Sequence, residues 1–138
     1  MPPIVEDWKW VVLTIAQEAS SEPIDGKIAV AEVIRERMEN KYNSDGTLVG
    51  TVLSPYQFSG WNSGDRNRIR VAQMDMTHPS MVDCIKAYEE AFQKRTNLAR
   101  GANLYHADWM VPFPEWTKSP KVTRLVSIGR HIFYKEER

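Results

Sequence analysis

Cysteine is almost absent from this chain of 138 residues, which contains only Cys84. A single cysteine cannot form an internal disulfide, so a packed core must stabilise the fold. A chain of this length can bury about two-thirds of the surface that its unfolded state exposes. Cys84 lies within an apolar helical pattern, where a small buried thiol is expected. We therefore expect one domain, residues 1–138, with one hydrophobic core.

An excess of charge of either sign is also absent, because 18 basic residues balance 18 acidic ones. Without an overall positive field, the sequence gives no support for binding to nucleic acid or to an anionic membrane. No apolar run approaches the length of a membrane span, and the start, MPPIVEDWKW, lacks the order of a secretory signal. We expect a protein made in the cytoplasm without a signal peptide and without membrane insertion.

Histidine is scarce as well, and His78, His106 and His131 lie far apart in the sequence without the paired spacing of metal ligands. No serine has the sequence context of a nucleophile elbow. The sequence therefore predicts no metal site and no organic cofactor, and it argues against Ser-His-Asp catalysis.

The stretch 10–38 contains two apolar helical patterns that are separated by a short polar elbow. Apolar residues recur there at three- and four-residue spacing, which predicts helices over 7–19 and from about 24 to 40. Pro23 and the serines before it interrupt the pattern, since both disfavour a continuing helix. Glu18 thus stands at a helix end beside apolar neighbours. The charged residues of the second helix are expected mostly on a solvated face: Lys27, Glu32, Arg35, Glu36 and Glu39.

The rest of the chain predicts short elements. Residues 48–53 form an apolar segment of one or two helical turns, and the apolar stripe of 81–92 predicts a further helix that ends near residue 94 or 96. Residues 122–126 alternate between apolar and polar, residues 131–134 form a second short strand, and residues 104–106 are a candidate third strand. The sequence predicts an α+β fold, mainly helical with a small antiparallel β-hairpin or sheet near the C-terminus.

Glu18 has the setting of a general acid. Burial beside apolar groups raises the pKa of a carboxyl group and keeps a proton available near neutral pH, as the protonation of a glycosidic oxygen requires. A carboxylate on the helix surface is the alternative interpretation. Glu22 and Asp25 are candidate second carboxylates, although Glu22 can equally end the first helix. Asp25 lies in the first turn of the second helix, where the helix dipole favours a negative charge, so it can equally have only this structural role.

The loop SPYQFSGWNSGDRNR, residues 54–68, interleaves aromatic and polar side chains. Flat rings stack on sugar faces, while amides and hydroxyls bind sugar hydroxyl groups. Tyr56, Phe58 and Trp61 are therefore candidates for lining a groove. The alternative is that one or two of these rings fill the core.

Five segments in chain order match one known pattern. They are the run QEASSEPIDGKIAVAEVIRERM at 17–38, Gln57-Phe58-Ser59, Thr96 with Gly101-Ala102 and Tyr105-His106, Trp116, and Ile128-Gly129 with His131 and Phe133-Tyr134. Together they resemble the spore-cortex-lytic-enzyme type of cell-wall hydrolases, a family with a lysozyme-like, lytic-transglycosylase-like domain that also occurs in phage proteins. Ser21, Glu36 and Arg130 depart from it, standing where glycine, asparagine and asparagine are usual.

The resemblance implies a peptidoglycan-cleaving catalytic domain whose substrate is the glycan strand and whose catalytic glutamate is Glu18. The residues that it implies as substrate-binding are Gln57, Phe58, Ser59, Tyr105 and His106. It leaves His131 as a structural or cleft-wall residue. No obvious partner carboxylate is present, which favours a lytic transglycosylase, using one glutamate as acid and then as base, over a two-carboxylate hydrolase.

Three alternatives remain open at this point. The first is a lysozyme-like hydrolase of the same bond. The second is an amidase, because the family name has also been attached to amidase activity. The third is a phage virion or tail protein that keeps the fold as a structural or binding module. A phage particle, or release through a pore made by a holin, would bring a protein without a signal peptide to the cell wall.

Overall fold

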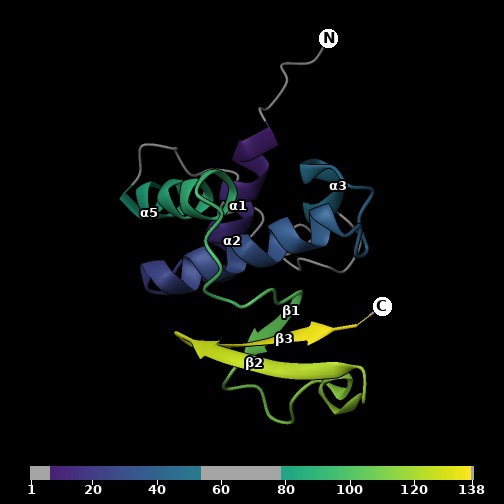
Figure 1. Ribbon diagram of the computed structural model, residues 1–138. Helices are drawn as coiled ribbons and strands as arrows, with labels where there is room; N and C mark the ends of the chain where they lie inside the picture. The colour runs from purple at the N-terminus through teal and green to yellow at the C-terminus, as the bar shows by residue number, and fades with distance from the viewer. Residues whose placement is uncertain (1–6, 54–78, 138) are drawn as a thin grey trace.

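The computed structural model describes residues 7–53 and 79–137, and its α-helices cover one face of a small sheet (Figure 1). The helical elements are α1 (Asp7–Ala19), α2 (Ile24–Glu39), α3 (Leu48–Val52), α5 (Pro79–Tyr88), the π-helix η2 (Glu89–Gln93) and the 3-10 helix η3 (Glu115–Lys118). The strands are β1 (Leu104–Ala107), β2 (Val122–Ile128) and β3 (His131–Glu136). This confirms the mainly helical α+β fold with a small antiparallel sheet near the C-terminus.

The apolar periodicity predicted the helix bounds well. Helix α1 has the predicted bounds, and α2 ends at Glu39, one residue before the expected end. The two helices pack against each other, and Ile15, Ile34 and Phe133 belong to one core cluster in which each is fully buried. Cys84 is a buried free thiol, as expected, and burial raises its pKa to about 11, so it stays protonated at neutral pH.

Helix α2 is the centre of the helical layer. It contacts α1, α3, α5 and η2 and also reaches β2, and Figure 1 shows it running between the other helices and the sheet. A helix surrounded in this way has little solvated surface. The expectation of a mostly solvated charged face is therefore wrong for Lys27, Glu32 and Arg35, which are 5%, 1% and 4% exposed.

The Glu32 carboxylate binds backbone rather than a cation. It accepts hydrogen bonds from the N–H groups of Leu98, at 2.9 Å, and Ala99, at 2.8 Å. These two N–H groups belong to the loop that leads from the helices into the sheet. A buried carboxylate is tolerated here because its oxygens are satisfied by hydrogen bonds.

Two arginines of α2 bind the same connecting segment. Arg35 Nη1 donates to the carbonyl oxygens of Ala91, at 2.8 Å, and Thr96, at 2.7 Å. Arg37 Nε donates to the carbonyl oxygen of Asn103 at 2.7 Å, directly before β1 begins. The charged residues of α2 therefore fix the path of residues 91–103.

The sheet has the strand order β1-β3-β2 and is antiparallel throughout. Strand β2 runs two residues further than the predicted alternation, and β3 extends to Glu136. Gly129 and Arg130 form the two-residue turn between β2 and β3. Of these two residues, Gly129 alone has a positive φ, of 58°, which is typical of a type II′ turn.

The two faces of the sheet pack against different parts of the chain. Phe133 belongs to the core under the helices, and Tyr105 is its partner on β1. On the other face, His106 packs against Trp116 and Tyr134. The segment after β1 covers this face before the chain enters β2 (Figure 1).

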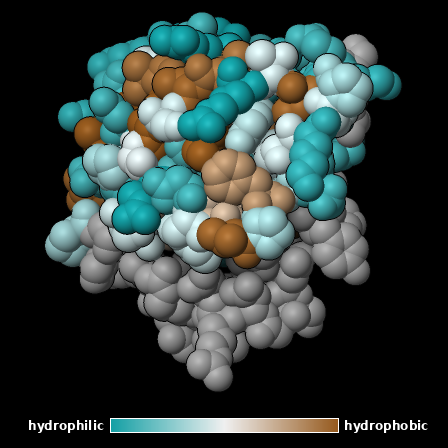
Figure 2. All heavy atoms as spheres, turned by 90° about the horizontal axis from the view of Figure 1, so that it is seen from below, coloured by the Kyte–Doolittle hydropathy of each residue, from teal (hydrophilic) through white to brown (hydrophobic). Residues whose placement is uncertain are grey.

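Seen from the side of the sheet, the surface is mixed, with hydrophobic residues scattered between hydrophilic ones (Figure 2). Within residues 7–53 and 79–137, no helix combines the length and the apolar character needed to cross a membrane.

Replacing Glu32 by alanine tests the importance of its two hydrogen bonds. We expect Glu32→Ala to lower the free energy of unfolding by about 2 to 6 kcal/mol, because each of the two N–H groups left without an acceptor costs about 1 to 3 kcal/mol. Urea unfolding followed by circular dichroism measures this loss.

The matched control is Glu115→Ala in η3, whose side chain is 88% exposed and lies 3.6 Å from Lys118. A surface pair of this kind contributes little, so a change within about 0.5 kcal/mol is expected. Equal stability of Glu32→Ala and the wild type would exclude Glu32 as an anchor of the loop.

Candidate active site

Glu18 lies in the last turn of α1, where the helix end approaches the sheet, and its side chain is partly exposed. The hydroxyl group of Tyr105, on β1, donates a hydrogen bond to Glu18 Oε1 at 2.6 Å. Burial raises the pKa of Tyr105 well above its usual value, and the negative charge of Glu18 raises it further. Tyr105 therefore remains a neutral hydrogen-bond donor to Glu18 across the physiological pH range.

Glu18 lines a pocket of about 330 Å³. The walls come from the end of α1, the elbow before α2, the end of β1 and the β2–β3 turn. The lining residues are Glu18, Ser21, Glu22, Ala107, Trp109, Arg130 and His131. A pocket of this size, with a carboxyl group on its wall, is large enough to hold a small organic group such as a sugar ring.

Glu22 also lines this pocket, but its carboxylate binds the β2–β3 turn. The side chain is 4% exposed, and Oε1 accepts a hydrogen bond from the backbone N–H of Arg130 at 2.8 Å. A Cβ atom on Gly129 would lie only 2.9 Å from Glu22 Oε2. The turn therefore needs glycine at 129 both for its positive φ and for the space that Glu22 occupies.

His131 forms the wall between Glu22 and Tyr105. Its Nδ1 lies 3.0 Å from Glu22 Oε1, although the two groups are not aligned for a hydrogen bond. The ring meets that of Tyr105 edge-on, with centroids 5.0 Å apart. Burial lowers the pKa of His131, and the charge of Glu22 offsets only part of this effect. His131 is therefore mainly neutral at pH 7.

Arg37 adds a buried positive charge near Tyr105 and Glu18, and it interacts electrostatically with both. Burial lowers the pKa of Arg37, but a guanidinium remains protonated in proteins at neutral pH. The site therefore combines a carboxyl group, a neutral hydroxyl donor and a permanent cation.

The structure brings only some of the predicted site residues together. Tyr105 and Glu22 lie beside Glu18, whereas Asp25 is exposed in the first turn of α2 and does not line the pocket. Gln57, Phe58 and Ser59 lie outside the described residues, as do Tyr56 and Trp61. Glu36 does not line the pocket. It accepts hydrogen bonds from the Asn40 side chain at the end of α2.

His106 faces away from Glu18, although it follows Tyr105 directly. It is 4% exposed, its Nδ1 donates to the carbonyl oxygen of Ala107, and its Nε2 accepts from the hydroxyl group of Tyr134 at 2.8 Å. Neighbouring strand residues point to opposite faces, so only one of this pair can face Glu18. His106 is therefore buried on the face of the sheet opposite Glu18, and its contact with the glycan stays a prediction.

Four residues of the pocket lining were not among the predicted site residues. Ser21 and Arg130 appeared only as departures from the family pattern, and Ala107 and Trp109 were not singled out. The sequence signal that could have identified Trp109 was its position two residues after a short strand, in a loop rich in proline.

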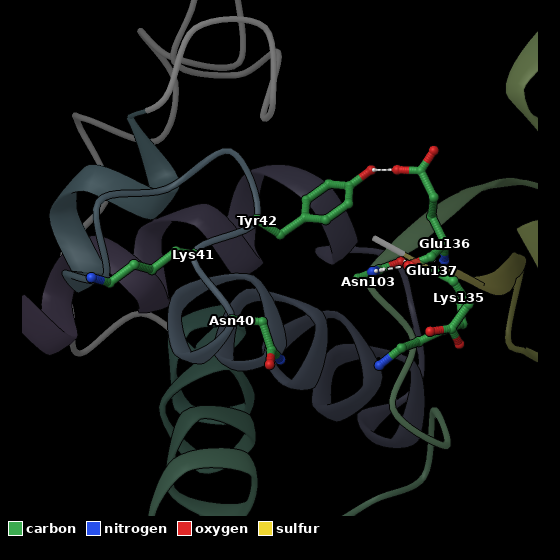
Figure 3. Close-up of a pocket in the computed structure, with 7 residues that line it drawn as sticks. All are labelled: Asn40, Lys41, Tyr42, Asn103, Lys135, Glu136 and Glu137. Carbon is green, nitrogen blue, oxygen red and sulfur yellow. Dashed lines mark hydrogen bonds between the residues drawn. The ribbon is translucent and has the colours of Figure 1, made fainter. Parts of the chain in front are cut away.

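A second pocket, of about 240 Å³, lies at the C-terminal end of α2 beside the end of β3 (Figure 3). Tyr42 donates a hydrogen bond to Glu136 Oε1 at 2.7 Å, and the Asn103 amide binds both the N–H and the carbonyl group of Glu136. Lys135 extends into the space that faces Asn40 (Figure 3). None of the predicted site residues lines this pocket. Among the described residues, no three potential metal ligands lie together at either place.

The family model described as Cell Wall Hydrolase matches residues 21–134, and the chain belongs to this family. The matched range includes Glu22, Tyr105 and His131, and it begins three residues after Glu18.

Two solved structures have the same fold. The catalytic domain of the germination-specific lytic transglycosylase SleB from Bacillus anthracis has a TM-score of 0.70 and 21% sequence identity, over 98% of this chain and 99% of that chain. The catalytic domain of the Bacillus cereus SleB protein has a TM-score of 0.69 and 19% identity, over 94% of this chain and 89% of that chain. A comparison with curated proteins finds no match.

The lowered pKa of His131 predicts a pH dependence of stability. Between that lowered pKa and the usual value of about 6.5, the unfolded chain binds a proton that the folded protein does not. Stability is therefore expected to fall as the pH drops from about 7 to 5, and His131→Gln should flatten this part of the profile. Urea unfolding at a series of pH values measures the slope. An identical slope in both proteins would contradict the prediction.

Proposed function

We propose that this chain cleaves the glycan strands of peptidoglycan as a single catalytic domain, with Glu18 as the acid. The observation that carries the proposal is the position of Glu18 on the wall of a sugar-sized pocket, with its Oε1 bound to Tyr105. A carboxyl group so placed can reach the glycosidic oxygen of a bound sugar. Membership of the cell wall hydrolase family and the fold shared with a lytic transglycosylase domain over nearly the whole chain support the same reaction.

The proposed reaction is a lytic transglycosylation, which consumes no water. Protonated Glu18 gives its proton to the glycosidic oxygen, and the bond from that oxygen to the anomeric carbon breaks. The Glu18 carboxylate then removes the proton of the same sugar's C6 hydroxyl group, whose oxygen attacks the anomeric carbon and closes an anhydro ring. Glu18 ends the cycle protonated, as it began it.

Tyr105 and Arg37 support the intermediate stage of this cycle. Glu18 is negatively charged between the two proton transfers. The hydrogen bond from Tyr105 and the positive charge of Arg37 both stabilise an anion at that point. Because both groups are fixed by the fold before substrate binds, they need no rearrangement during the reaction.

Hydrolysis of the same bond is the second candidate, because Glu22 lines the same pocket. A hydrolase needs a second carboxylate that activates water. Glu22 is almost fully buried, and its Oε1 already accepts the Arg130 N–H, so it has the contacts of a structural residue. Asp25 lies outside the pocket. These positions favour the single-glutamate reaction.

Glu18→Gln tests the proposal, since the amide keeps the shape of the side chain but has no transferable proton. We expect the rate of fragment release from purified peptidoglycan to fall at least about 100-fold, the usual contribution of a positioned acid. Mass spectrometry of the soluble fragments should find anhydro-ended products from the wild type and almost none from the variant.

The control is Asp25→Asn, the same carboxylate-to-amide change at an exposed position that does not line the pocket. It should release fragments at the wild-type rate. Wild-type activity of Glu18→Gln would exclude Glu18 as the acid. Reducing-end products would instead mean hydrolysis, and no fragments from any of the three proteins would favour a binding or structural module.

Tyr105→Phe tests the hydrogen bond to Glu18 without removing the ring that packs against His131 and Phe133. We expect a decrease in kcat of about 10- to 100-fold, since a hydrogen bond to a charged group contributes about 1.5 to 3 kcal/mol. The rate of fragment release under saturating substrate measures kcat. Tyr88→Phe, on α5, is the matched control and should keep full activity. Equal kcat values for both variants would contradict the role of Tyr105.

A further inference from the structure

The turn after β1 exposes large apolar side chains. Trp109 is 69% exposed and Val111 is 92% exposed, while Met110 and Phe113 are 36% and 37% exposed. An exposed tryptophan leaves a large apolar ring in water, and exposed apolar side chains that lie together often mark a site of interaction.

This turn is held in place beside the pocket. The Asp108 N–H donates to the Arg130 carbonyl oxygen at 2.8 Å, and Arg130 Nε donates to both Asp108 carboxylate oxygens at 3.0 and 3.2 Å. The Met110 N–H also bonds back to the carbonyl oxygen of Ala107 at 3.3 Å. The backbone at Trp109 is therefore held on both sides, by Asp108 and by Met110, while the indole ring itself is exposed.

Trp109 differs from its exposed neighbours because it lines the same pocket as Glu18, whereas Val111 does not. Arg130 and Ser21 line that pocket too, and the Arg130 side chain is 68% exposed. The pocket thus presents an aromatic face together with polar donors. A pyranose ring matches this combination, since its C–H face is apolar and its edge carries hydroxyl groups.

We propose that Trp109 is a stacking platform for a pyranose ring of the glycan strand, next to the bond that Glu18 cleaves. The inference rests on the proposed function and adds the residue that binds the sugar. The C–H face of the ring packs on the indole, and Arg130 and Ser21 donate hydrogen bonds to hydroxyl or acetamido oxygens at the sugar's edge.

The test compares Trp109→Ala with Val111→Ala, which removes an even more exposed apolar side chain of the same turn from outside the pocket. The probe is the β-1,4-linked hexamer of N-acetylglucosamine, titrated into each protein by calorimetry. Trp109→Ala should raise the Kd about tenfold, the effect of losing one aromatic contact, and should raise KM on peptidoglycan more than it lowers kcat. Trp109→Phe should restore part of the affinity, and Val111→Ala should bind within about twofold of the wild type.

Three results would overturn the platform: an unchanged Kd for Trp109→Ala, equal weakening by Val111→Ala, or no binding of the hexamer by the wild type. Fragment release from peptidoglycan, measured in parallel, decides separately on the proposed function. Cleavage that depends on Glu18, together with a Kd that does not depend on Trp109, would remove only the platform. Thermal unfolding of each variant shows that the fold is intact.

Discussion

The Glu22 carboxylate joins the helical part of this protein to its sheet. It belongs to the elbow between α1 and α2, and it accepts the backbone N–H of Arg130 in the turn between β2 and β3. A Cβ atom at position 129 would lie only 2.9 Å from Glu22 Oε2, so a side chain there would displace this carboxylate. Because Glu18 stands four residues before Glu22, this one hydrogen bond fixes the helix end that carries Glu18 against the hairpin that forms the opposite wall of the pocket.

A second junction lies at the other end of β3. Arg37 donates to the backbone of Asn103, whose side chain in turn binds the backbone of Glu136 on both sides. With Glu22 at the start of β3 and Asn103 at its end, the central strand is tied to the helical part at both ends. Strand β1 pairs with β3 between these junctions, which places the Tyr105 hydroxyl group within hydrogen-bond distance of Glu18.

The elements of the fold were predictable because they depend on local pattern. The helix bounds at Asp7, Ala19 and Ile24 follow from apolar spacing and from the elbow, and the strands follow from alternation. The burial of Glu32 was not predictable in this way. Periodicity assigns a charged residue to the solvated side, whereas the N–H groups that satisfy Glu32 lie 66 and 67 residues further along the chain.

By itself, the sequence determined the two helices, the polar elbow, the C-terminal hairpin and the presence of Glu18 at a helix end. Only the tertiary structure decided which neighbours Glu18 has. It turned the Tyr105 hydroxyl group toward Glu18 and buried His106 on the far face of the sheet, and it placed Trp109 on the pocket wall. The physical reason is that a hydrogen bond or a pocket wall joins residues from distant segments, and the spacing within one segment contains no information about the other.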